Sequence, residues 1–175
     1  MPNYRRVFID GYSYFLTVVM YKRNPILIDN IDLLRKSFKE SKKKYNYDIK
    51  AIVILPDHFH MMILPTRAIE YPKIISVIKQ YFTRHCDPRF YQHLTQSKSR
   101  TLAGYKPVWQ KKYYEHAVRN TTDYKTRFDY IHYNPVKHGY VKQVKAWRAS
   151  SFHKYVSLGI YDSEWGDFHN KIDYE

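Results

Sequence analysis

The stretch DIKAIVILPDHFHMMIL, residues 48–64, contains two apolar runs separated by Pro56 and Asp57. Both runs are rich in β-branched and other large apolar side chains, and a Pro-Asp pair is typical of a turn. The stretch therefore predicts a hairpin of two adjacent antiparallel strands, over residues 48–56 and 58–64.

The sequence on either side of this hairpin alternates between strand and helix patterns. Further strands are expected at residues 13–22 and 108–118, and helices at 29–45, from 71 to before Asp87, and at 120–133, where Asn120 is a candidate cap and Pro135 a stop signal. Residues 88–107 lack periodicity and predict an exposed loop. The order predicts an α+β fold, a ferredoxin-like antiparallel sheet flanked by α-helices.

The composition indicates one folded domain with an acidic partner. The chain has 175 residues, 44% of them hydrophobic, and a formal net charge of +14. Its single cysteine, Cys86, forms no internal disulfide, and no apolar run approaches the ~20 residues of a membrane helix. No secretory signal is recognisable either, so we expect a cytoplasmic protein without a membrane partner. We divide the chain into a domain of residues 1–160 and an acidic C-terminal tail of residues 161–175.

Two histidines lie at the start of the strand predicted over residues 58–64. Because strand side chains alternate between faces, His58 and His60 are expected to project from one face while Phe59 anchors the other. Two metal ligands would then lie side by side. A purely structural histidine pair is the alternative.

Tyr130 and Asn134 are four residues apart near the end of the third predicted helix, which puts a phenol and an amide one turn apart on one face. Taken alone, Tyr130 would pack and Asn134 would cap the helix before Pro135. Combined with two imidazoles, however, they predict a divalent cation site beside an oxygen nucleophile. Such a site suits phosphoryl transfer through a covalent phosphotyrosine, with Mg²⁺ or Mn²⁺ as the cation.

Several strings in the chain match one known family. The string YIHYNPVKHG at residues 130–139, with LPDHFH at 55–60, resembles the REP-associated tyrosine transposases, which are single-tyrosine transposases. The similarity continues in NYRR at 3–6, VWQKKYYEH at 108–116 and SSFHKYV at 150–156. It covers most of the chain.

This resemblance implies a His-hydrophobic-His (HUH) endonuclease fold and cleavage of single-stranded DNA near hairpin, or palindromic, repeats. It implies that His58 and His60 bind the cation with Asn134 as third ligand, and that Tyr130 becomes joined to a 5′ phosphate, leaving a free 3′ hydroxyl. Religation to another end would complete strand transfer. Tyr124 and Tyr133 are close enough in sequence that the choice of Tyr130 requires a test. The resemblance also suggests a nucleoid-associated protein that acts as a monomer or homodimer.

The basic residues predict the DNA-binding surface. No acidic residue occurs between Asp87 and Glu115, and basic side chains alternate there with aromatic ones, which suits phosphate contacts and base stacking. The residues that we assign to DNA binding are Arg5, Arg6, Arg100, Lys106, Trp109, Lys111, Lys112 and Lys137.

Two other functions fit the same features. A noncatalytic hairpin-binding module would use the basic and aromatic residues alone, and substitution of the histidines would then leave cation binding and strand cleavage unchanged. A replication-initiator or relaxase-type nickase would share the chemistry but act at an origin. Flanking palindromic repeats in the genome would favour the transposase.

Overall fold

A computed structural model describes residues 6–166, in which four strands form one antiparallel sheet of order β2-β3-β1-β4. The strands are β1 (Tyr14–Val19), β2 (Tyr47–Ile54), β3 (His58–Pro65) and β4 (Tyr114–Ala117). The α-helices in this part of the chain are α1 (Ile31–Lys44), α2 (Tyr71–His85), α3 (Lys98–Leu102), α4 (Thr121–Lys137) and α5 (Phe152–Ser157). This is the ferredoxin-like arrangement expected from the sequence.

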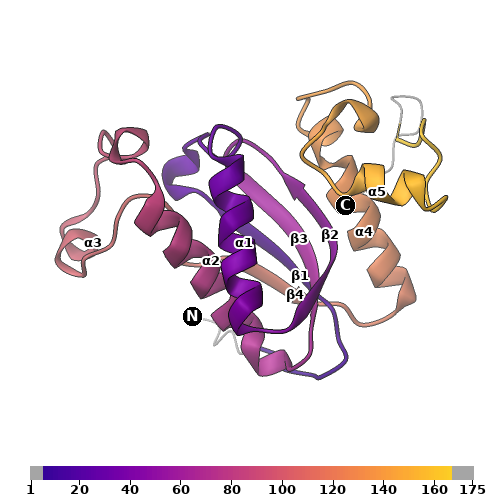
Figure 1. Cartoon of the computed structure of the whole chain (residues 1–175), viewed down its shortest axis with the longest axis horizontal. Coiled ribbons are helices and arrows are strands. Elements are labelled where there is room, and N and C mark those ends of the chain that lie inside the picture. Colours follow the sequence, from indigo (N-terminus) through magenta and orange to yellow (C-terminus); the bar gives the residue numbers. More distant parts are fainter. Residues whose placement is uncertain (1–5, 167–175) are drawn as a thin grey trace.

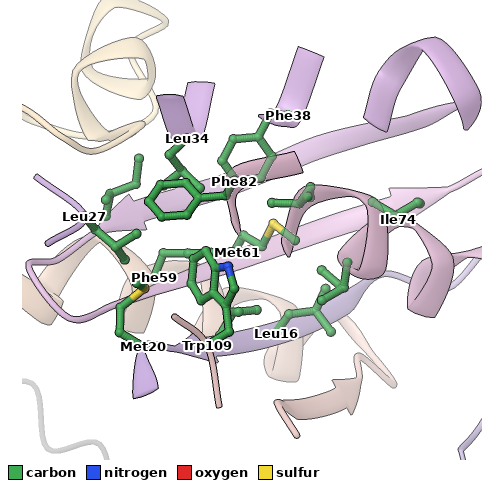
Figure 2. Close-up of a cluster of buried hydrophobic side chains, with 14 of the residues drawn as sticks. Leu16, Met20, Leu27, Leu34, Phe38, Phe59, Met61, Ile74, Phe82 and Trp109 are labelled. Atoms are coloured by element: carbon green, nitrogen blue, oxygen red, sulfur yellow. The ribbon is translucent and has the colours of Figure 1, made fainter. Parts of the chain in front are cut away.

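Helices cover both faces of the sheet (Figure 1). Helices α1 and α2 pack on one face over a core that includes Leu16, Phe59 and Met61, and Figure 2 shows Trp109 among these side chains. Helix α4 and the chain that follows it pack on the other face, against Phe15 and Met62. The alternation of strand side chains thus separates two cores.

The turn at Pro56 and Asp57 joins β2 to β3 as predicted. Across β3, His60 pairs with Thr17 of β1 on one side and with Val53 of β2 on the other. The histidine strand is therefore central in the sheet, and its geometry is fixed by neighbours on both sides.

Two predicted elements differ in length from the observed ones. The strand expected over residues 108–118 is regular only in β4; before it, Trp109 forms an isolated antiparallel bridge with Met20, and the carbonyl oxygens of Gln110 and Lys111 accept hydrogen bonds from the Lys79 ammonium. The loop expected over residues 88–107 contains the short helix α3. In Figure 1 this segment projects from the body of the molecule beside α2.

Helix α4 continues through Pro135, where the sequence predicted a stop. The helix ends instead at Lys137, and Gly139, the second residue after it, has a positive φ of 72°. Tyr140 N–H donates to the Pro135 carbonyl and Gly139 N–H to that of Val136, at 2.9 Å each. These are the paired bonds of a Schellman motif, which favours glycine at this position. The extra turn carries Lys137 and brings His138 close to β3.

The predicted acidic tail begins inside the fold. Tyr161 is 8% exposed and belongs to the core beneath α4, and Trp165 packs against it. Lys145 and Glu164 form an ion pair nearby. Residues 167–175 of the predicted tail lie outside the described residues.

None of the helices within residues 6–166 has both the length and the apolar character needed to cross a lipid bilayer.

Candidate active site

His58 and His60 project from the same face of β3, as the strand alternation predicted. The two residues are 2% and 4% exposed, and their ring centroids are 4.8 Å apart with the planes at 89°. Phe59 between them is fully buried in the core under α1 and α2. Phe59 thus anchors this part of β3 in one core, and the two imidazoles lie edge to face on the opposite side of the sheet, toward α4.

Each imidazole is held at its Nδ1 atom. Nδ1 of His58 lies 2.6 Å from Oδ1 of Asp57, and Nδ1 of His60 lies 2.8 Å from Oγ1 of Thr17. When such a partner accepts a hydrogen bond from Nδ1–H, Nε2 is left as the unprotonated, basic nitrogen, and the orientation of the ring is fixed. Both rings can therefore present Nε2 to a cation.

Tyr130 and Asn134 of α4 complete the site. The ring of Tyr130 lies 5.3 Å from that of His60, and Asn134, one turn later, is fully buried. Of the other two candidate tyrosines, Tyr124 packs against Phe128 and Tyr133 against Trp165. The helix thus brings Tyr130, and neither of its neighbours, against the histidine strand.

Two buried polar atoms in this site, Nε2 of His60 and Oδ1 of Asn134, make no hydrogen bond of good geometry in the described part of the chain, although the Asn134 side chain lies close enough to His60 to raise its pKa as a hydrogen-bond partner would. Unsatisfied buried polar atoms are costly and are uncommon in folded proteins. An imidazole nitrogen and an amide oxygen are both cation ligands, so a bound divalent cation would satisfy them. Within residues 6–166, no cluster of three or more His, Cys, Asp or Glu side chains suits a metal ion.

The electrostatics of the site keep both histidines neutral. Burial lowers the pKa of His60 well below its ordinary value, and the nearby His58 and His138 lower it further, while Asn134 opposes the shift. Burial also lowers the pKa of His58, and this effect outweighs the carboxylate of Asp57, which raises that pKa. Neutral imidazoles are the form that binds a metal ion.

A cavity of about 450 Å³ opens beside the phenol of Tyr130. His60 and Thr17 line one part of it, and Tyr114 and Arg127 line another. A group that enters this cavity meets the phenol, an imidazole and a guanidinium together, which are the contacts that a phosphate would need.

Sequence reasoning missed several of these neighbours. Lys137, predicted to bind DNA, lies with its Nζ 4.7 Å from the ring centroid of Tyr130. His138, to which the sequence gave no role, lies 5.3 Å from His58. Its position four residues after Asn134 on the same helix was the available signal. Thr17 and Arg127 gave no recognisable signal, because only the pairing of β1 with β3 and the packing of α4 bring them here.

The remaining predicted DNA contacts do not form one surface with the site. Arg6 pairs with Glu115 at 3.1 Å on the α2 face, Lys112 is exposed, and Arg5 lies outside the described residues. Three others, Arg100, Lys106 and Lys111, line a cleft beside α2.

The prediction that Trp109 stacks on bases is wrong. Its ring is 4% exposed and packs edge to face against Phe59 and Phe82 in the core (Figure 2). An indole in this position has no open face for a base.

Comparisons with known proteins agree with the geometry. The family model of IS200-like transposases matches residues 9–134, which include both histidines, the tyrosine and the asparagine of the site. A protein of Haemophilus influenzae named as a REP-associated tyrosine transposase is 40% identical over 95% of this chain and 94% of its own length. A REP-associated tyrosine transposase of Escherichia coli is 36% identical over 94% of this chain and 91% of its own.

Among solved structures, a REP-associated tyrosine transposase bound to a REP hairpin superposes with a TM-score of 0.81 and 34% sequence identity, over 99% of this chain and 95% of that one. The fold is therefore shared along almost the whole chain. With both the family model and the relatives in agreement, the chain belongs to the REP-associated tyrosine transposases, within the IS200-like family.

Proposed function

We propose that the protein cuts and rejoins single-stranded DNA near hairpin repeats through a 5′-phosphotyrosine on Tyr130, with Mg²⁺ or Mn²⁺ held by His58, His60 and Asn134. The observation that carries this proposal is the pair of unsatisfied atoms, Nε2 of His60 and Oδ1 of Asn134, buried beside the phenol. Such a donor set costs stability unless a ligand completes it. A hairpin partner is supported by the related structure, which is bound to a REP hairpin.

The chemistry follows from the groups around the cavity. The bound cation would act as a Lewis acid on the scissile phosphate. Tyr130 loses its proton, and its oxygen attacks phosphorus while the bond from phosphorus to the 3′ oxygen breaks; that oxygen takes a proton and leaves as a free 3′ hydroxyl. Lys137, 4.7 Å from the ring, stabilises the phenolate, and Arg127 faces the phosphate.

Rejoining reverses the same step. The 3′ hydroxyl of another DNA end attacks the phosphotyrosine, a new phosphodiester forms, and Tyr130 takes back its proton. No net hydrolysis occurs, so the energy of the phosphodiester is kept through the covalent intermediate. An enzyme with this activity would act at the nucleoid, as a monomer or a homodimer.

The experiment is a covalent-adduct assay on single-stranded hairpin oligonucleotides with Mn²⁺. We expect the wild-type protein to form an adduct that survives denaturant, and Tyr130→Phe to form none. Tyr124→Phe and Tyr133→Phe are matched controls that lose the same hydroxyl from the same helix and should keep the adduct. An adduct in Tyr130→Phe at the wild-type level would reject the nucleophile, and loss of the adduct in a control instead would assign it elsewhere.

A further inference from the structure

A histidine and a carboxylate join the edge strand of the sheet to helix α4. Nε2 of His116 in β4 lies 2.7 Å from Oδ2 of Asp123, in the first turn of α4. A carboxylate only accepts hydrogen bonds, so Nε2 of His116 carries the hydrogen. The same oxygen accepts a second hydrogen bond, at 3.0 Å, from the backbone N–H of Arg119. Asp123 is thus fixed both to the sheet and to the start of the helix.

The other oxygen of Asp123 contacts an arginine of the Tyr130 cavity. Oδ1 lies 3.5 Å from Nε of Arg127, one turn further along α4, and this is the only ion pair of Arg127 within residues 6–166. A guanidinium has five N–H groups, so a contact through Nε leaves the four on its terminal nitrogens for another partner. Because Arg127 lines the cavity with Tyr130 and His60, a group bound there can be that partner.

An aromatic ring supports the same guanidinium. Cζ of Arg127 lies 5.3 Å from the ring centroid of Phe15, which is buried in the core under α4. Phe15 of β1 pairs with His116 of β4, so the strand register puts the ring and the imidazole side by side on the face that α4 covers. A guanidinium held between a ring and a carboxylate loses little conformational entropy when it binds a phosphate.

The carboxylate of Asp123 stays charged in the folded protein. Burial raises its pKa, but the hydrogen bonds from the Arg119 N–H and from His116 outweigh burial, so the pKa lies below its ordinary value. The side chain of Asp123 is 19% exposed and that of Arg127 is 30% exposed. Water and salt therefore screen their attraction less than they would on an open surface.

We propose that Asp123, fixed by His116, is a positioning residue that turns the Arg127 guanidinium toward a phosphate in the Tyr130 cavity. The inference rests on the proposed function, since it takes the group in the cavity to be a phosphodiester. Asp123 is not among the residues that line the cavity, so it acts only through Arg127. Its effect is to orient the terminal nitrogens of Arg127 before DNA arrives, so that no reorientation is needed as charge develops on the phosphate.

Asp123 also has a structural role at the start of α4. Its N–H donates to Oδ1 of Asn120 at 2.9 Å, and its Oδ2 accepts from the N–H of Arg119, so it helps to cap the helix. The substitution Asp123→Asn separates the two roles. It keeps one oxygen of the same shape for the cap but replaces the other with an amide group, which cannot accept from Arg127.

The first measurement requires no DNA. The side-chain Nε–H signal of Arg127 is identified in a nitrogen–proton correlation spectrum by its loss in Arg127→Gln, and its heteronuclear NOE reports fast motion of the guanidinium. We expect this NOE to fall in Asp123→Asn. It should keep the wild-type value in Asp32→Asn, a matched control that removes a first-turn carboxylate of α1 paired with Arg35. An unchanged NOE in Asp123→Asn would overturn the inference, whether or not DNA is cleaved.

The second measurement is a double-mutant cycle on the rate of adduct formation, at saturating hairpin oligonucleotide with Mn²⁺. Asp123→Asn should slow this rate by about 10-fold in the wild-type background and leave it unchanged in Arg127→Gln, because Asp123 acts only through Arg127. The affinity for DNA should not fall, since the substitution removes a negative charge. Equal slowing in both backgrounds would assign Asp123 to the helix cap alone and overturn the inference.

His116 is tested by two substitutions. His116→Gln keeps an amide N–H for Asp123 and should keep the wild-type NOE of Arg127, whereas His116→Leu should lower it as Asp123→Asn does. Equal values in the two variants would overturn the role of His116. If the wild-type protein forms no adduct, the proposed function fails, while the NOE values still decide whether Asp123 holds Arg127.

Discussion

Oδ1 of Asp57 lies 2.6 Å from Nδ1 of His58, while Oδ2 of the same carboxylate lies 3.0 Å from Nε of Arg23. Arg23 reaches Asp57 from a backbone with a positive φ of 57°, which is uncommon for a residue other than glycine. The carboxylate thus links a surface cation to a buried imidazole, and its negative charge makes that imidazole a better cation ligand.

Asp57→Asn should weaken cation binding with little change in fold. The amide keeps the shape of the carboxylate but not its charge, so we expect Mn²⁺ affinity to fall by about 10-fold to 100-fold. Isothermal titration with Mn²⁺ measures this directly, and excess Mn²⁺ should restore the adduct. Asp48→Asn is the control, because Asp48 is an exposed carboxylate of the same hairpin that pairs with Lys50. Equal affinities in the two variants would contradict a role for Asp57 at His58.

Asn134→Leu should make the protein more stable and inactive. The substitution removes a fully buried amide whose Oδ1 makes no hydrogen bond of good geometry in the described structure and replaces it with an apolar side chain of similar size. We expect the free energy of unfolding without metal to rise by about 1 kcal/mol, and the adduct to disappear. Urea denaturation in a chelating buffer measures the first effect. A variant less stable than the wild type would show that the amide is satisfied in the apoprotein.

Stability should fall in acid because of His132. This side chain is fully buried, with Nε2 2.8 Å from Oγ of Ser151, and burial lowers its pKa to about 4. Between pH 6.5 and 4 the unfolded chain binds a proton that the native state does not, so the free energy of unfolding decreases as the pH falls, by up to about 3 kcal/mol for this group.

The effect is isolated by the variant His132→Gln, which cannot titrate. It should be less stable than the wild type at pH 7, because it loses packing, and the difference should narrow as the pH falls to 4. Urea denaturation at several pH values gives the curve of unfolding free energy against pH for each protein. His93→Gln serves as a control that removes an exposed imidazole. Parallel curves for His132→Gln and the wild type would show that His132 takes up its proton while folded.

Gly139→Ala should slow adduct formation although Gly139 lies beyond the end of α4 and outside the site. Gly139 has a φ of 72° with open space around its Cα, so an alanine there adds backbone strain of about 1 kcal/mol without a clash. Because the turn that it closes carries Lys137 over Tyr130, we expect adduct formation to slow. Gly159→Ala, with a φ of 71° and equally open surroundings after α5, should cost similar stability and keep the wild-type rate. Equal rates in both variants would exclude a role for the helix end.

The sequence by itself determined the sheet and the identity of the central groups. The hairpin around Pro56 follows from local turn chemistry, and the same alternation of β3 that buries Phe59 puts His58 and His60 on the opposite face. The spacing of Tyr130 and Asn134 likewise fixes their common helix face. These periodicities depend only on the local strand or helix geometry, so they can be recognised in the sequence without knowing the tertiary contacts.

The tertiary structure decided what surrounds those groups. Thr17 lies against His60 through strand register, and Arg127 enters the cavity through the packing of α4 on the sheet. Burial of Trp109 and the continuation of α4 through Pro135 also depend on packing, which overrides the local preference of a residue for exposure or for a helix end. Side chains that come into contact by long-range packing have no fixed spacing in the sequence, so sequence periodicity does not predict these contacts.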